Sequence, residues 1–303
     1  MSEGLTPDDI QFLGTRHTKS FKAGRGTESP EYPGITEGGV ELAQTRARAI
    51  LEHIKSAPEG TVFFLAGASE LVRSKSTLRV YGDELEKLIT EDDALDIEVI
   101  GEDEVVSTGA SIGESVRSTA ESVRTHPDEK VVVVAPLAMA GFGVRGVWTD
   151  AEGKMPYYSE IQKRAGNNDD EAIKFWLENF RNEGGVLQVG EDSIHGPDPR
   201  AVAENQLKSI RRLHEFTRKY IGDRPTEIVF VGHAVNLDAL AVYLADGGQM
   251  RPETFESFGG TMRETETISL GIQEDSVTFT YGDRFQKVID NQDDTQSNSE
   301  ASE

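Results

Sequence analysis

The first strand-like segment of the sequence is Ile10-Gln11-Phe12-Leu13-Gly14-Thr15-Arg16-His17, a short apolar run followed closely by an arginine and a histidine. A late apolar run, residues 228–231, is followed in the same way by Gly232 and His233. Short runs rich in apolar residues are typical of strands in a buried parallel sheet. Ligands of such sheets bind outside the carboxyl ends of the strands. The two runs therefore predict that both histidines lie at one ligand-binding edge.

The rest of the chain alternates between strand-like and helix-like segments. Apolar runs predict strands at 10–13, 61–66, 97–100, 131–135 and 228–231, and helical periodicity predicts helices at 38–56, 74–89, 114–124, 171–181, 200–220 and 236–244. Residues 267–272 and 276–281 predict a C-terminal hairpin. This alternation predicts an α/β fold with a mostly parallel central sheet and helices on both faces.

The domain organisation follows from where this pattern is interrupted. Residues 139–199 are rich in loop-forming residues and predict a cap or insertion over the sheet. Residues 291–303 are polar and acidic, which predicts a disordered tail. We expect one domain over residues 1–290.

Composition limits the classes of function. The 303 residues include no cysteine, which excludes disulfides and thiolate chemistry. No signal-like N-terminus and no membrane-spanning apolar run is present, so we expect a cytoplasmic protein. The net charge of −23 disfavours nucleic acid and anionic membrane as partners. Basic side chains near the first and third motifs described below can reverse the charge locally: Arg16, Lys19, Lys22, Arg25, Arg73 and Lys75.

Four short motifs carry a resemblance to a known family. They are Arg16-His17-Thr18, Ile35-Thr36-Glu37-Gly38-Gly39-Val40-Glu41-Leu42-Ala43, Ser69 with Leu71, Arg73 and Thr77, and Gly232-His233-Ala234. In this order they resemble the signatures of the histidine phosphatase superfamily, which includes the cofactor-dependent phosphoglycerate mutases. The resemblance extends from about Ile10 to Arg284, around a non-matching middle, and implies a phosphoglycerate mutase-like fold. Thr18 and Ala234 stand where the family has glycine, and Thr18 puts catalytic efficiency in doubt.

The four basic residues of these motifs suit phosphoryl transfer through histidine. A nucleophilic imidazole must present one bare nitrogen while its other nitrogen is fixed by a hydrogen bond. We expect His17 to be the nucleophile and to form a phosphohistidine. Planar guanidinium groups match the oxygens of a transferring phosphoryl group. Arg16 and Arg73 are therefore expected to clamp it, and His233 to donate to it, and the resemblance implies the same roles.

The remaining site residues are predicted from position in the chain. The resemblance implies a carboxylate proton donor after the strand at 97–100, for which Glu104 comes first and Glu102 second. The resemblance also implies substrate contacts at Ser20, Lys22 and Arg25, because this loop lies near the substrate in the family. Thr18, which follows the first histidine, and Asn236, which lies shortly after the second, are predicted as further contacts. No histidine, aspartate or glutamate spacing indicates a metal site, so no metal and no cofactor are expected.

Hydrolysis of a small phosphate ester is the function that these observations favour. One alternative is a phosphoglycerate mutase-type transfer to a second hydroxyl, for which the insertion would have to exclude water. Another is a phospho-ligand or protein-binding module that has weak or no turnover. The sequence does not indicate the oligomeric state.

Overall fold

The computed structural model describes residues 10–22, 26–92, 95–102, 112–139, 141–272 and 276–290. Its strands are β1 (Ile10–Arg16), β2 (Val62–Ala68), β3 (Ile97–Ile100), β4 (Lys130–Val134), β5 (Val186–Val189), β6 (Asp192–His195), β7 (Thr226–Gly232), β8 (Thr267–Ile272), β9 (Ser276–Tyr281) and β10 (Phe285–Asp290). Its helices are α1 (Glu37–Ser56), α2 (Val72–Thr90), α4 (Ile112–Thr125), α5 (Pro156–Arg164), α6 (Asp169–Glu183), α7 (Pro199–Ile221), α8 (Ala234–Ala245) and α9 (Pro252–Ser257). Every strand and helix predicted from the sequence is confirmed, with small shifts of its ends.

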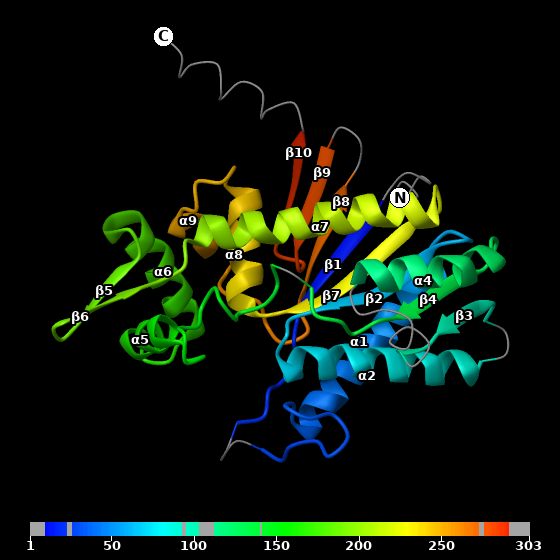
Figure 1. The fold of residues 1–303 in the computed structure, drawn as a ribbon, viewed down its shortest axis with the longest axis horizontal. Coiled ribbons are helices and arrows are strands. Elements are labelled where there is room, and N and C mark those ends of the chain that lie inside the picture. The colour runs from blue at the N-terminus through cyan, green and yellow to red at the C-terminus, as the bar shows by residue number, and fades with distance from the viewer. Residues whose placement is uncertain are drawn as a thin grey trace, which may run out of the picture.

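One central sheet organises the fold (Figure 1). It has eight strands in the order β10-β9-β8-β1-β7-β2-β4-β3. The strands from β1 to β3 in this order run parallel, whereas β8 pairs with β1 antiparallel and β9 and β10 continue the antiparallel part. The structure confirms the predicted α/β class and the hairpin of β8 and β9. It adds β10, a strand that the sequence analysis missed.

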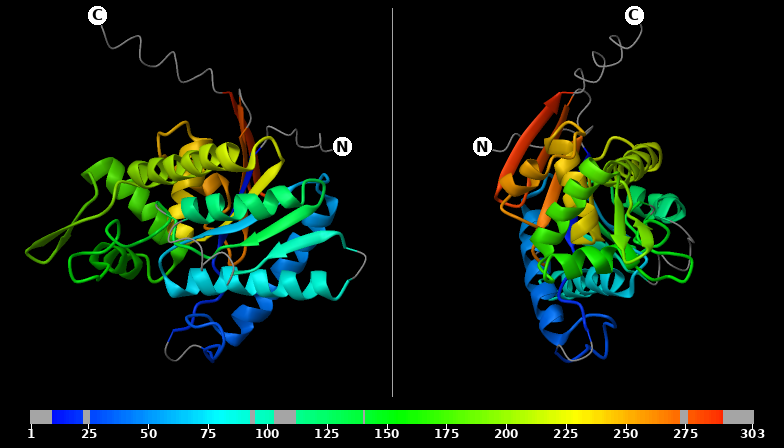
Figure 2. Two further views of the ribbon diagram at one scale, coloured as in Figure 1. Left: turned by 45° about the vertical axis from the view of Figure 1, so that its right-hand side comes forward. Right: turned by 90° about the vertical axis from the view of Figure 1, so that its left-hand side faces the viewer.

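Helices cover both faces of the sheet, because side chains of a strand alternate between them. In β7, Ile228 and Phe230 join one buried cluster, while Val229 and Val231 join the other. The first cluster packs against α4, α7 and α8, and the second against α1 and α2. Figure 2 shows these helices as two layers on either side of the sheet.

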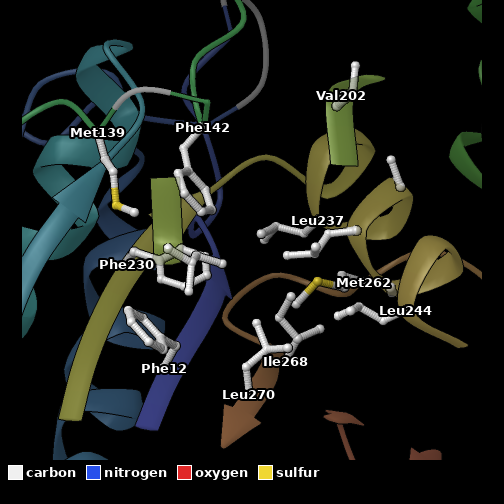
Figure 3. Packing of buried hydrophobic residues seen from close by; sticks show 14 of the residues in the cluster. Phe12, Met139, Phe142, Val202, Phe230, Leu237, Leu244, Met262, Ile268 and Leu270 are labelled. Atoms are coloured by element: carbon white, nitrogen blue, oxygen red, sulfur yellow. The ribbon is translucent and has the colours of Figure 1, made fainter. Parts of the chain in front are cut away.

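The sheet packs tightly where β1, β7 and β8 meet (Figure 3). Phe12 and Phe230 lie side by side here, with Ile268 of β8 close to them. A Cβ atom on Gly14 would lie 2.5 Å from the Phe230 ring, so this close approach requires glycine. The Phe142 ring packs on the Phe230 ring with centroids 4.4 Å apart. The segment after β4 is therefore anchored directly on the centre of the sheet.

The segment 139–199 forms α5, α6 and the β5–β6 ribbon beyond one end of the sheet (Figure 1). The sequence predicts α6 but not α5, because α5 begins among the loop-forming residues of segment 139–199. Pro156 instead occupies the first turn of α5, where its missing N–H costs nothing. Trp148 and Trp176 pack with ring centroids 4.7 Å apart and belong to the same buried cluster as α7 and α8. None of the described helices is long and apolar enough to cross a membrane.

Candidate active site

Three neighbouring parallel strands deliver the motif residues to one edge of the sheet. His17 follows β1, His233 follows β7 and precedes α8, and Ser69 follows β2. The backbone N–H of His17 donates to the Gly232 carbonyl at 3.0 Å, which fixes the two strand ends side by side. The histidine rings lie 5.1 Å apart between centroids, at an angle of 66°. The structure thus brings together the two histidines that the sequence placed at this edge.

His17 has a defined tautomer. Its Nδ1 lies 2.7 Å from the carbonyl oxygen of Thr18 and must carry the proton, because a carbonyl only accepts. Its Nε2 is therefore bare, and it accepts from Nε of Arg73 at 3.1 Å. The side chain is 8% exposed. Burial first, then the charges of Arg73, Arg16 and Lys22, lower the pKa of His17 to about 3, against an opposing hydrogen bond to Thr18. The imidazole is neutral near neutral pH and has the form of a nucleophile.

His233 has the opposite tautomer. Arg73 Nη2 lies 3.3 Å from its Nδ1, which must accept because a guanidinium only donates. Its Nε2–H therefore donates to Ser69 Oγ at 2.7 Å. Burial, followed by the proximity of His17, Arg73 and Arg16, lowers the pKa of His233 well below its ordinary value. In this tautomer Nδ1 of His233 carries no proton and acts as an acceptor.

The guanidinium groups of Arg73 and Arg16 complete the candidate site. Arg73 reaches both histidines and so marks the point on which the two bare nitrogens converge. Arg16 donates from Nη1 to the Met262 carbonyl and lies 3.3 Å from Asp169 of α6. Its Nε is buried and has no hydrogen-bond partner. Two fixed cations beside a bare imidazole nitrogen suit a tetrahedral dianion.

Thr18 is accommodated in the place of the family glycine. It does not have a positive φ, so its backbone does not need glycine. Its side chain is fully buried, and its hydroxyl donates to the Gly39 carbonyl at 2.8 Å. Gly39 in turn has no space for a Cβ atom, which would lie 2.7 Å from the Lys19 carbonyl. Thr18 therefore fastens the first motif to the start of α1, and its hydroxyl is already engaged.

The other predicted substrate contacts differ in their placement. Asn236 is 1% exposed, and its amide accepts from the Trp148 indole at 2.8 Å and donates to the Gly143 carbonyl at 3.0 Å. These partners make it a support for the segment after β4 instead of a group facing ligand. Ser20 is half-buried and forms an isolated bridge with Ile35. Lys22 is exposed, and Arg25 lies outside the described residues.

The predicted proton donors are not found in the described part of the site. Glu104, the first choice, lies outside the described residues. Glu102, the second choice, forms a two-pronged ion pair with Arg79, with contacts of 2.6 to 3.1 Å. Its carboxylate is directed to that arginine and not to Arg16 or Arg73. Neither carboxylate predicted from the sequence is therefore placed beside the two histidines by the described residues.

Sequence reasoning also missed Asp238 as a residue that supports the site. It is fully buried and accepts from the Tyr281 hydroxyl at 2.6 Å, the Met262 N–H at 3.2 Å and the Thr261 hydroxyl. Burial raises its pKa to about 6, although these hydrogen bonds oppose the shift. Because Met262 also accepts from Arg16, Asp238 holds the loop that positions this arginine. An aspartate in the apolar helix α8 was the available signal.

A group of potential metal ligands lies elsewhere. Within the described residues, ligand atoms of Glu98, His126 and Glu129 lie within 4.8 Å of one another, although the sequence spacing indicated no metal site. The His126 ring contacts the Glu129 carboxylate at 2.8 Å, and Glu98 is half-buried. Glu98 belongs to the edge strand β3. The group contributes nothing to the candidate active site.

The comparisons with known proteins found distant similarity only. No family model and no curated protein matches the sequence. A mycobacterial glucosyl-3-phosphoglycerate phosphatase complexed with VO3 is 13% identical over 91% of this chain and 99% of that chain, with a TM-score of 0.42. A phosphoserine phosphatase mutant from Entamoeba histolytica is 11% identical over 89% and 95%, with a TM-score of 0.40. A putative alpha-ribazole-5'-P phosphatase from Escherichia coli is 13% identical over 93% and 96%, with a TM-score of 0.38.

Proposed function

We propose that this protein is a phosphohydrolase that cleaves a phosphate ester through a phosphohistidine on His17. One observation carries the proposal: the bare Nε2 of His17 faces Arg73, while the Thr18 carbonyl holds the proton on Nδ1. A nucleophilic imidazole requires this division of roles between its two nitrogens. The neutral state of His17 means that no proton has to leave before attack.

The first chemical step transfers the phosphoryl group to His17. Nε2 attacks phosphorus, the P–N bond forms, and the bond to the ester oxygen breaks in line. Arg73 and Arg16 balance the charge on the equatorial oxygens, a contribution that is greatest in a buried, preorganised site. His233 becomes protonated beside the bound dianion and donates from Nδ1 to the same group.

The second step returns the nucleophile to its starting state. Water attacks the phosphohistidine, the P–N bond breaks, and inorganic phosphate leaves. Transfer to a second hydroxyl would make the protein a mutase, and a site without turnover would make it a phospho-ligand-binding module. These alternatives differ in what happens to the phosphoenzyme, so one experiment separates them.

The test is single-turnover labelling with p-nitrophenyl phosphate that carries a radiolabelled phosphoryl group. Parent protein is quenched in alkali, because phosphohistidine is stable in base and labile in acid, and is compared with His17→Ala. His195→Ala is the matched control, since His195 is an exposed histidine of β6. We expect base-stable label on the parent and the control but not on His17→Ala.

Each other outcome has a defined meaning. Label that decays in water supports hydrolysis, whereas decay that requires added 3-phosphoglycerate supports mutase-type transfer. Absence of label together with phosphate binding that depends on Arg16 and Arg73 supports the binding module. Absence of both label and phosphate binding would refute phosphoryl chemistry at this site.

A further inference from the structure

We propose that Asp169, at the start of α6 in the insertion, is the acid that protonates the leaving oxygen. This inference rests on the proposed function. A phosphoryl group attacked by His17 Nε2 expels its leaving oxygen on the opposite side, away from the strand ends. An alkoxide is a poor leaving group unless a proton reaches it during the step. The acid must therefore lie near the arginine clamp but not on the strand that carries His17.

Asp169 meets this geometric requirement. Its Oδ2 lies 3.3 Å from Nη2 of Arg16, so one guanidinium group can contact both a phosphoryl oxygen and this carboxylate. Its Oδ1 accepts from the amide of Gln162 at 2.9 Å, and this amide also donates to the Tyr158 hydroxyl at 3.0 Å. The side chain is 45% exposed, which leaves it open to substrate. The insertion thus holds a carboxylate against the clamp.

Other carboxylates near the site have different partners. Glu70 accepts from the backbone N–H groups of Val144 and Arg145 at 3.0 and 2.7 Å, so it fastens the segment after β4. Asp238 is enclosed by the loop that it supports. Among the described residues, Asp169 is the carboxylate in an ion pair with one of the two arginines of the clamp.

Substrate binding changes the surroundings of Asp169 in the direction that catalysis needs. In the free protein Arg16 balances its negative charge. A bound phosphoryl dianion takes over Arg16 and places a second negative charge beside the carboxylate. A neighbouring like charge favours the neutral carboxyl form. The neutral carboxyl is the form that can pass a proton to the leaving oxygen.

The proton balance closes over the two steps. As the P–N bond forms and the P–O bond breaks, the carboxyl proton of Asp169 passes to the ester oxygen and an alcohol leaves. The Asp169 carboxylate then accepts a proton from the attacking water. The P–N bond breaks, phosphate is released, and Asp169 regains the carboxyl proton with which the first step began, so the two steps together consume only ester and water.

The experiment compares two esters that differ in their need for an acid. Single-turnover phosphoenzyme formation is measured with p-nitrophenyl phosphate and with glycerol phosphate, in parent protein and Asp169→Asn. The p-nitrophenolate ion leaves without a proton, whereas the glycerol alkoxide does not. We expect Asp169→Asn to slow the glycerol ester by about 10²–10⁴-fold and the p-nitrophenyl ester much less. Glu171→Gln, on an exposed side chain of the same helix turn, should change neither rate.

The controls separate this inference from the proposed function. A parent protein that forms no phosphoenzyme refutes the proposed function. A labelled parent with an equal loss or a gain on both esters in Asp169→Asn refutes the acid role alone, because Asp169 then acts only on Arg16. Glu104→Gln is run in parallel. If Glu104→Gln, and not Asp169→Asn, shows the ester-dependent loss, the acid is Glu104.

Discussion

Neutral His17 makes a prediction about stability that is independent of any substrate. The pKa of His17 is lowered from 6.5 to about 3 by burial and by the neighbouring cations. A depressed folded-state pKa contributes stability that is present above the unfolded pKa and is lost as pH falls through the folded pKa. One pH unit within that window corresponds to about 1.4 kcal/mol. We therefore expect the charging of His17 alone to lower the unfolding free energy by about 2 kcal/mol as the pH falls from about 7.5 to about 5.

The assay is urea unfolding of parent protein and His17→Gln at several pH values. The carboxylates titrate in both proteins, so their contribution cancels in the difference between them. The stability advantage of the parent over His17→Gln should shrink by about 2 kcal/mol as the solution is acidified. His195→Ala, which removes an exposed histidine of β6, is measured alongside as the control. A difference between parent and His17→Gln that stays constant with pH would show that the folded protein does not suppress the charge on His17, and the argument for a neutral nucleophile would fail.

Three further predictions concern the support of the site. Thr18→Gly should lower the unfolding free energy by about 2 kcal/mol, because it removes a buried side chain and its hydrogen bond to Gly39; unchanged urea stability would contradict this. Burial raises the pKa of Asp238 from 3.8 to about 6. Its contribution to the free energy of unfolding is therefore fully present below pH 3.8 and is lost as the pH rises through 6. The stability of the parent relative to Asp238→Asn should then fall by about 3 kcal/mol as the pH rises from 3.8 to 6. An increase over the same range would contradict a raised pKa of Asp238. Phe230→Ala should lower the free energy of unfolding, measured in urea, by about 3–5 kcal/mol. A loss below about 1 kcal/mol, roughly the value of one buried methylene, would mean that neighbouring side chains fill the space left by the ring.

The elements that carry the two histidines could be predicted because their signal is local. An apolar run followed by a basic residue identifies a buried strand and the edge to which it delivers that residue, and this holds for both β1 and β7. The partners of the site residues could not be predicted in this way. Asp169 meets Arg16 only because the insertion places the start of α6 beside the end of β1, and the Asn236 amide is engaged because Trp148 reaches it. Such contacts join positions far apart in the chain, and no spacing in the sequence encodes them.

The place of β1 in the sheet has a consequence for biosynthesis. The strand β1 (Ile10–Arg16) is synthesised well before its partners β7 (Thr226–Gly232) and β8 (Thr267–Ile272). Its backbone groups have no native strand partner until most of the chain has left the ribosome. Arg16 also receives its carbonyl partner from Met262. A nascent chain or a prematurely terminated product that lacks these segments therefore cannot bring the two histidines together or give Arg16 its Met262 partner.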